Sequence, residues 1–233
     1  MTWLHVKSHY SLGVGTASIP AIIAHASEAG IRALALTDLE NLYGQVELHR
    51  GSRAAGVRAI TGIELREQWA ANKSHGTKRG RIVLLARDRT GYANLCRIVH
   101  ARRSSAKPTP APIRTLERLG DLAGLFILTD DPSTLAQAVR VAAVADVRAL
   151  VVRPGGVHPE AALLAEAKRH GIRGVASCEG IFLDAAEWEL HRLIGAVHLA
   201  LGVREAGVTI ETSDRRVRSR AAMQALFLDI PDA

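Results

Sequence analysis

The sequence predicts an α/β fold in which seven strands form a closed or nearly closed barrel. Seven short apolar runs, often β-branched, recur along the chain, and segments with helical spacing of apolar residues lie between them. Because parallel strands need crossover connections, this alternation favours a parallel sheet. Seven units favour a barrel over an open doubly wound sheet, and no Gly-rich phosphate fingerprint follows any strand. We expect the strands at 3–8, 33–38, 58–64, 81–87, 124–129, 149–153 and 173–179.

The expected helices have recognisable ends. The first, 18–30, has a serine cap, Pro20 in its first turn and a glycine at its end. The stretch 102–113 contains three prolines and predicts an extended crossing segment, whereas 67–80 is polar and basic and predicts a loop. The remaining helices are expected at 41–56, 90–103, 132–145, 159–171, 185–201 and 219–228.

Length and composition set the broad class. A chain of 233 residues with 48% hydrophobic and 4% aromatic residues can bury a large, mainly aliphatic core. We expect one barrel domain at 1–202 and a C-terminal extension at 203–233. The two cysteines suggest no disulfide framework, and neither a signal peptide nor a membrane-spanning run is visible. These observations predict a cytoplasmic protein without a membrane partner.

The positive charge is concentrated in one stretch. The chain carries a net charge of +7, and residues 66–118 hold thirteen Lys or Arg against three acidic residues. A basic stretch of this kind is typical of a surface near DNA or another polyanion. Solvated arginines without a partner are the alternative, and the sequence leaves both open.

Polar groups stand at the ends of four expected strands. They are His5 with Lys7, then Asp38, Glu64 and Glu179. The carboxyl ends of parallel barrel strands meet at one end of the barrel, where such groups build a site. We therefore predict that strands 1, 2, 3 and 7 converge on one pocket, with His5 and Glu179 no more than a barrel width apart.

Several motifs resemble the PHP (polymerase and histidinol phosphatase) domain of bacterial DNA polymerase III alpha subunits and their error-prone relatives. The opening His-Val-Lys-Ser-His-Tyr-Ser-Leu is similar to His-x-His-Ser-x-Tyr-Ser-Leu, and 33–44 resembles the Thr-Asp-His-x-Asn-Leu-x-Gly element. The segment 84–96 is similar to one in the polymerase branch, and 222–233 looks like the passage to the polymerase palm. The resemblance implies a distorted seven-stranded TIM-like barrel. It also implies up to three zinc or manganese ions that hydrolyse phosphate esters and, in some polymerases, support proofreading.

The chain departs from the metal-binding pattern of that family at most positions. Lys7, Val14, Leu39 and Arg81 stand where the resemblance places ligands, and the closing element lacks its histidine at Ile181. A charged lysine and aliphatic side chains offer no lone pair to a metal. Lys7 and Arg81 can instead neutralise the remaining carboxylates. The residual metal ligands are then His5, Glu64 and Glu179. The ligand that the resemblance places after the fifth strand falls near Asp130 or Asp131, so one of these two aspartates joins the set. The pocket candidates are His5, Lys7, Asp38, Glu64, Arg81, Asp131 and Glu179.

Three functions from different classes follow. The first is a PHP module with a degenerate metal site and no cofactor, which is not an enzyme by itself. It would support a polymerase body or other replication proteins in DNA replication or translesion synthesis, with DNA contact possible through 66–118. The second is a residual phosphoesterase or 3′-5′ exonuclease that uses substoichiometric zinc or manganese. The third is a stand-alone protein that binds an anion through Lys7 and Arg81. The polymerase-like segment 84–96 favours the first.

Overall fold

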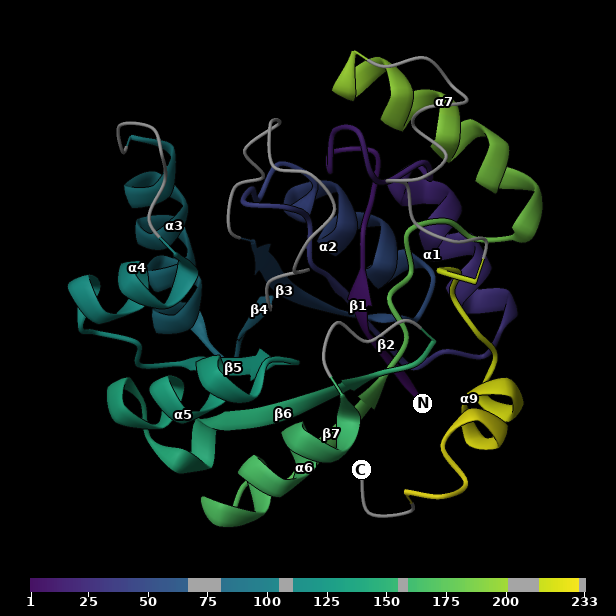
Figure 1. Cartoon of the computed structure of the whole chain (residues 1–233). Helices are drawn as coiled ribbons and strands as arrows, with labels where there is room; N and C mark the ends of the chain where they lie inside the picture. Colours follow the sequence, from purple (N-terminus) through teal and green to yellow (C-terminus); the bar gives the residue numbers. More distant parts are fainter. Residues whose placement is uncertain (67–80, 105–110, 155–158, 201–213, 231–233) are drawn as a thin grey trace.

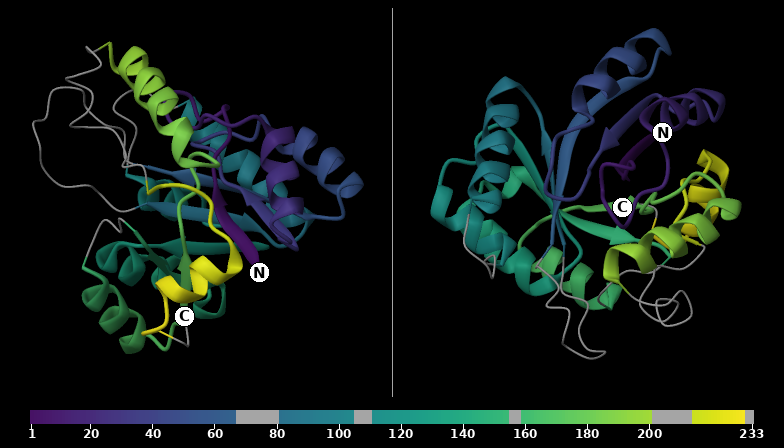
Figure 2. Two further views of the ribbon diagram at one scale, coloured as in Figure 1. Left: turned by 90° about the vertical axis from the view of Figure 1, so that its right-hand side faces the viewer. Right: turned by 90° about the horizontal axis from the view of Figure 1, so that it is seen from above.

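The computed structural model describes residues 1–66, 81–104, 111–154, 159–200 and 214–230. Strands gather at the centre and helices lie around their outside (Figures 1 and 2). The strands are β1 (Thr2–Val6), β2 (Ala33–Leu36), β3 (Arg58–Leu65), β4 (Ile82–Ala86), β5 (Leu125–Thr129), β6 (Val147–Val152) and β7 (Gly174–Ser177). The α-helices are α1 (Ile19–Glu28), α2 (Gln45–Ala54), α3 (Arg89–Arg103), α4 (Pro112–Leu119), α5 (Pro132–Val141), α6 (Glu160–Arg169), α7 (Trp188–Leu199) and α9 (Arg220–Leu226). Two 3-10 turns, Val144–Asp146 and Ala185–Glu187, complete the described elements.

The seven strands follow one another in chain order within a single sheet, and the ends of that sheet meet. The Lys7 N–H donates to the Gly180 carbonyl at 2.8 Å, and the Gly180 N–H donates to the His5 carbonyl at 2.8 Å. These two hydrogen bonds join β1 to the segment after β7. The predicted seven-stranded, nearly closed α/β barrel is confirmed.

Strand β4 runs opposite to the prediction of a parallel sheet. It pairs antiparallel with both β3 and β5, whereas the pairs β1–β2, β2–β3, β5–β6 and β6–β7 are parallel. An apolar run identifies a buried strand but does not give its direction. The stretch between β3 and β4 carries no apolar helical pattern, and antiparallel neighbours need no crossover helix. The missing helical pattern between these two strands was therefore the sequence signal for an antiparallel β4.

The predicted helices lie within a few residues of the observed ones, with one exception. Helix α4 was missed, because the prolines of 102–113 suggested an extended segment. Pro112 occupies the first turn of α4, where its missing N–H costs nothing, and Gly120 at a φ of +71° follows the last turn. Residues 105–110 of the predicted segment, and the predicted loop 67–80, lie outside the described residues.

Side chains alternate along each strand between two cores. One set packs outward against the helices, and a smaller set fills the barrel interior: Ala35, Val83, Leu85, Leu128, Leu150 and Val152, with Leu4, Ile60, Phe126 and Val175 packed against them. The same alternation fixes which residues face the barrel axis at its two ends.

The C-terminal residues 214–230 lie on the barrel beside the chain's N-terminus (Figure 1). Trp3 Nε1 donates to the Arg218 carbonyl at 2.9 Å, and Phe227 is buried in the outer core. Arg153 pairs with both Glu160 at 2.6 Å and Asp229 at 2.5 Å. The predicted division at residue 202 stays a prediction, since 201–213 lie outside the described part. Among the described residues, no helix is long and apolar enough to cross a membrane.

Candidate functional site

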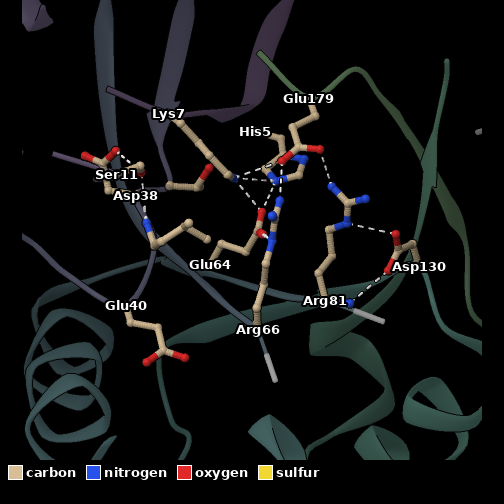
Figure 3. Close-up of polar contacts among 12 residues, drawn as sticks. His5, Lys7, Ser11, Asp38, Glu40, Glu64, Arg66, Arg81, Asp130 and Glu179 are labelled. Atoms are coloured by element: carbon tan, nitrogen blue, oxygen red, sulfur yellow. Dashed lines mark hydrogen bonds and ion pairs between the residues drawn. The ribbon is translucent and has the colours of Figure 1, made fainter. Parts of the chain in front are cut away.

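The predicted strand-end residues meet at one end of the barrel, which we call the mouth. His5, Glu64 and Glu179 each place one possible ligand atom within 4.8 Å of the others, and all three side chains are buried. Because β4 is antiparallel, its first residues lie at the same end, and Arg81 directly precedes it. We predict that strands 1, 2, 3 and 7 converge on one pocket. The structure brings together His5, Glu64 and Glu179 of strands 1, 3 and 7, and Figure 3 shows these side chains pointing toward one another. Asp38, after strand 2, is not part of this trio.

Lys7 lies between the carboxylates of the mouth. Only 1% of Lys7 is exposed to solvent. Its ammonium donates to Glu64 Oε2 at 2.6 Å and lies 3.3 Å from Glu179 Oε1 and 3.1 Å from His5 Nε2. The predicted ion pair between Lys7 and a strand-end carboxylate is therefore present, with two partners.

Three arginines complete the cluster. Arg66 reaches Glu179 Oε1 at 2.6 Å and also contacts Glu64. Arg81 donates to Glu179 Oε2 at 2.5 Å through Nη1 and to Asp130 Oδ2 at 2.8 Å through Nε. Arg215, from the C-terminal segment, contacts Glu179 Oε2. The carboxylate of Glu179 is thus surrounded by four cationic side chains. We call Lys7, Arg66, Arg81 and Arg215 with Glu64, Asp130 and Glu179 the mouth cluster.

The cluster keeps Glu64 and Glu179 ionised although both are completely buried. Burial alone raises a carboxyl pKa, but Arg66, Lys7 and His5 together hold the pKa of Glu64 well below its usual value. Arg81, Arg66, Lys7 and Arg215 do the same for the pKa of Glu179. Burial, and then the charge of Lys7, lowers the pKa of His5 to about 4. At neutral pH the mouth therefore holds the ionised carboxylates of Glu64 and Glu179 beside a neutral His5 imidazole.

Asp38 occupies the same end of the barrel but serves a neighbouring turn. Its carboxylate accepts from the Ser8 N–H at 2.7 Å, from Ser8 Oγ at 2.8 Å and from Ser11 Oγ at 2.6 Å. Burial nevertheless raises the pKa of Asp38. These hydrogen bonds hold the turn that directly follows Lys7, and the charge of Lys7 also acts on the Asp38 carboxylate by lowering its pKa.

The structure separates the two aspartates that follow β5. Asp130 pairs with Arg81 in the mouth cluster. Asp131, the predicted pocket candidate, caps α5 and accepts from the Ser133 and Thr134 N–H groups at 3.2 and 3.1 Å. An aspartate next to Pro132 at the start of a helix has the sequence signature of an N-cap, and this signal identifies Asp131.

Arg66 and Arg215 are site residues that the sequence reasoning missed. Arg66 follows Glu64 by two residues, so the alternation along β3 could have placed it on the barrel axis. Arg215 gave no local signal. It reaches Glu179 because the Ile181 N–H donates to the Arg215 carbonyl at 2.9 Å, which fixes the C-terminal segment beside the mouth.

Within the described part of the basic stretch 66–118, the cations do not all lie on an exposed surface. Arg81 and Arg102 are buried, and Arg66 is turned into the mouth cluster. Arg102 donates to Glu40 Oε1 at 2.9 Å and to the Arg66 carbonyl at 2.8 Å. These three cations hold the fold together, and several others of the stretch lie outside the described residues.

The ligand atoms of His5, Glu64 and Glu179 fit a bound metal ion poorly in the arrangement that the structure shows. Zinc and manganese need neutral imidazoles and free carboxylate oxygens at fixed geometry. Here the Lys7 ammonium contacts ligand atoms of His5, Glu64 and Glu179, and each carboxylate of the trio also pairs with arginine. An ion could enter this space only if Lys7 moved out of it.

The fold and the strand-end site define a PHP-type barrel, and the comparisons agree. Residues 4–146 match the family model of the PHP domain, so the chain belongs to this family. An error-prone DNA polymerase of Anaeromyxobacter sp. (strain K) is 39% identical over 111 residues, covering 48% of this chain and 9% of that protein. The DNA polymerase III alpha subunit of Escherichia coli (strain K12) is 27% identical over 253 aligned positions, covering 99% of this chain and 21% of the subunit.

A solved structure supports the same fold. A Bifidobacterium adolescentis protein, provisionally described as a metal-dependent phosphoesterase, superposes with a TM-score of 0.52 at 16% identity, covering 77% of this chain and 87% of that one. At this identity the likeness concerns the fold alone. The chain spans about a tenth to a fifth of the length of the polymerases it matches.

Proposed function

We propose that this chain is a PHP module in which the mouth cluster takes the place of the family's metal ions. Its role would then be structural: it supports a DNA polymerase body or other replication proteins during replication or translesion synthesis. The match along 99% of the chain to a polymerase III alpha subunit supports this context. The chain by itself would not be an enzyme.

The position of Lys7 carries the proposal. Its ammonium touches ligand atoms of His5, Glu64 and Glu179 while it is almost fully buried. Metal ions at the strand ends would serve to neutralise buried carboxylates. Lys7 and the three arginines supply four positive charges against the three carboxylates of the mouth cluster, so electrostatic balance needs no metal. A buried acid left without such partners would be strongly destabilising.

A residual phosphoesterase or 3′-5′ exonuclease is the second candidate. The observation in its favour is the trio His5, Glu64 and Glu179, whose ligand atoms lie within 4.8 Å of one another. His5 Nδ1 is buried and has no hydrogen-bond partner among the described residues. This candidate requires displacement of Lys7, and zinc or manganese would then be held at partial occupancy. The anion-binding hypothesis is weaker, because Lys7 and Arg81 are both committed to carboxylates.

Metal content and hydrolysis together test the proposal. The purified chain is analysed for zinc and manganese, melted with and without a chelator, and assayed on p-nitrophenyl phosphate with each metal added. We expect far less than one ion per chain, an unchanged melting temperature and no hydrolysis. A metal that binds only the folded state stabilises it by mass action, so a large chelator-induced drop would contradict the proposal. Metal-dependent hydrolysis that Glu64→Gln abolishes would establish the second candidate.

The supporting role has its own test. Crosslinking in cells that express the chain, followed by mass spectrometry, should recover peptides of a DNA polymerase or of replication proteins. A set of crosslinks that contains none of these would reject the supporting role and leave the account of the mouth cluster intact.

A further inference from the structure

Arginines extend the inward-facing rows of four strands at the barrel end opposite the mouth. Ile60, Leu85, Leu150 and Val175 face the barrel interior. Along a strand every second residue faces the same side, so the residue two positions further toward this end continues the row. On β3, β4, β6 and β7 that residue is an arginine: Arg58, Arg87, Arg148 and Arg173. We call these four residues, with Arg32, the arginine floor.

Strand pairing and shared contacts bring these residues together. Ala149 pairs with Gly174 in the β6–β7 register, which places Arg148 beside Arg173. The guanidinium carbons of Arg87 and Arg148 lie 5.6 and 6.0 Å from the centroid of the Phe126 ring. The Arg58 N–H donates to the Arg32 carbonyl at 2.9 Å, so these two are neighbours as well.

Carboxylates balance only part of this charge. Arg87 pairs with Asp146 at 3.0 Å and lies 3.9 Å from Asp88. Arg148 donates to the Ala145 and Val147 carbonyls, both at 2.7 Å. Arg32, Arg58 and Arg173 are exposed, and no carboxylate pairs with their guanidinium groups in the part of the chain that the structure describes. Several exposed like charges at one end repel one another unless an external anion binds them.

We propose that the arginine floor binds the phosphate backbone of a nucleic acid without reading its sequence. A guanidinium presents two parallel donors that match a phosphate, and a repeating polyanion suits cations spread over several strand ends. Phe126 is only partly exposed and lies under two guanidinium groups, so it offers no stacking platform for bases. An acidic protein is the alternative partner. Protein interfaces usually have an apolar centre, and the arginines of the floor do not supply one. The proposal does not depend on whether the mouth binds metal.

Fluorescence anisotropy on the full chain tests this surface. The probes are a fluorescein-labelled 20-nucleotide oligo-dT and a 20-base-pair duplex, at several salt concentrations. The floor variant combines Arg58→Gln with Arg173→Gln. The matched control combines Arg50→Gln with Arg220→Gln. Both control residues are exposed and lie on helices, α2 and α9, and neither belongs to the floor or to the stretch 66–118.

The floor variant should bind at least one of the two probes about tenfold more weakly at low salt. For the single strand, loss of two phosphate contacts should reduce the slope of log affinity against log salt by about 1.4. The control variant should stay within about twofold of the parent. Equal losses in both variants would mean that only net charge matters and would overturn the proposal. A parent chain that binds neither probe would also overturn the proposal. So would a competition experiment in which polyglutamate releases the bound probes and unlabelled oligo-dT does not.

Discussion

The two ends of the barrel use the same residue type in opposite ways. At the mouth, Arg81 and Arg215 are buried and each pairs with Glu179. At the floor, Arg58 and Arg173 are exposed and have no carboxylate partner among the described residues. The difference comes from the opposing groups, since strand-end acids converge at the mouth, whereas Asp88 and Asp146 are the only acids of the described ranges that pair with a floor arginine.

The contrast between mouth and floor distinguishes charged side chains that stabilise the fold from charged side chains that can bind a ligand. A buried cation that is fully paired stabilises the fold and is unavailable to a ligand, whereas an exposed, unpaired one adds little to stability and can meet an external anion. Removing a mouth charge should therefore affect unfolding, and removing a floor charge should affect only binding.

The largest effect is expected for Glu179→Ala. This change removes the carboxylate that faces Lys7, Arg66, Arg81 and Arg215, and it leaves several buried cations without their partner. The free energy of unfolding should fall by about 4 kcal/mol, measured by urea denaturation. If the variant does not fold, Glu179→Gln combined with Lys7→Met serves instead, and it should be more stable than Glu179→Gln alone. No stabilisation by the second change would contradict the shared cluster.

Lys7→Ala should lower the free energy of unfolding by about 3 kcal/mol, because Glu64 then loses its direct ammonium partner in a buried site. Lys7→Met keeps most of the apolar stem and separates lost packing from lost charge. A Lys7→Ala variant as stable as the parent would mean that Lys7 does not hold these carboxylates together.

His5 should make the fold less stable in mild acid. The pKa of His5 is lowered from 6.5 to about 4 in the folded protein. Between these values the unfolded chain binds a proton that the folded chain does not, so stability is complete above about pH 6.5 and declines as pH falls toward 4. The unfolding free energy should be about 2 kcal/mol lower at pH 5 than at pH 7.5 through His5 alone.

The control for the acid effect is His5→Gln, measured at the same two pH values. Glu64 and Glu179 keep their charge in this range because the pKa of each lies well below 4.5. Asp38, whose pKa is raised, contributes in the opposite direction, but it is present in both proteins and cancels in the comparison. An equal pH dependence of parent and variant would exclude His5 as the cause.

The smallest effect on stability is expected at the floor. Arg58→Gln and Arg173→Gln should each change the unfolding free energy by less than about 0.5 kcal/mol, since both side chains are exposed and pair with no carboxylate of the described ranges. Arg81→Gln is the matched change at the mouth and should cost several times as much. Similar costs at the two ends would remove the distinction between structural and binding arginines.

The fold was predictable because it depends on periodic patterns. Apolar runs gave all seven strands, and the serine and proline signals placed the start of α1. The direction of β4 was not predictable from its apolar run, and the prolines before α4 suggested the wrong conformation. Local sequence patterns indicate which residues are buried and where helices and strands begin and end. Strand direction depends instead on how segments far apart in the sequence pair with one another.

The candidate site was predictable only where its residues stand at strand ends. His5, Lys7, Glu64, Arg81 and Glu179 fall into this class, and the structure brings all five together. Arg215 could not be found in this way because its contact with Glu179 depends on the path of the C-terminal segment. Asp130 and Asp131 both follow β5, and the pocket residue predicted from the sequence was Asp131. The place of Asp131 before Pro132 is the signature of an N-cap, and this signal would have pointed to Asp130 for the mouth.

Restoration of the missing ligands tests the central claim most directly. The variant Lys7→His with Leu39→His and Ile181→His replaces the Lys7 ammonium and adds imidazoles beside Glu64 and Glu179, and Lys7→Ala is the control without new ligands. Isothermal titration with zinc and with manganese should show saturable binding to the triple variant and little or none to the parent or to Lys7→Ala. A parent chain that binds either metal as tightly as the triple variant would contradict the account that the mouth cluster replaces the metal ions.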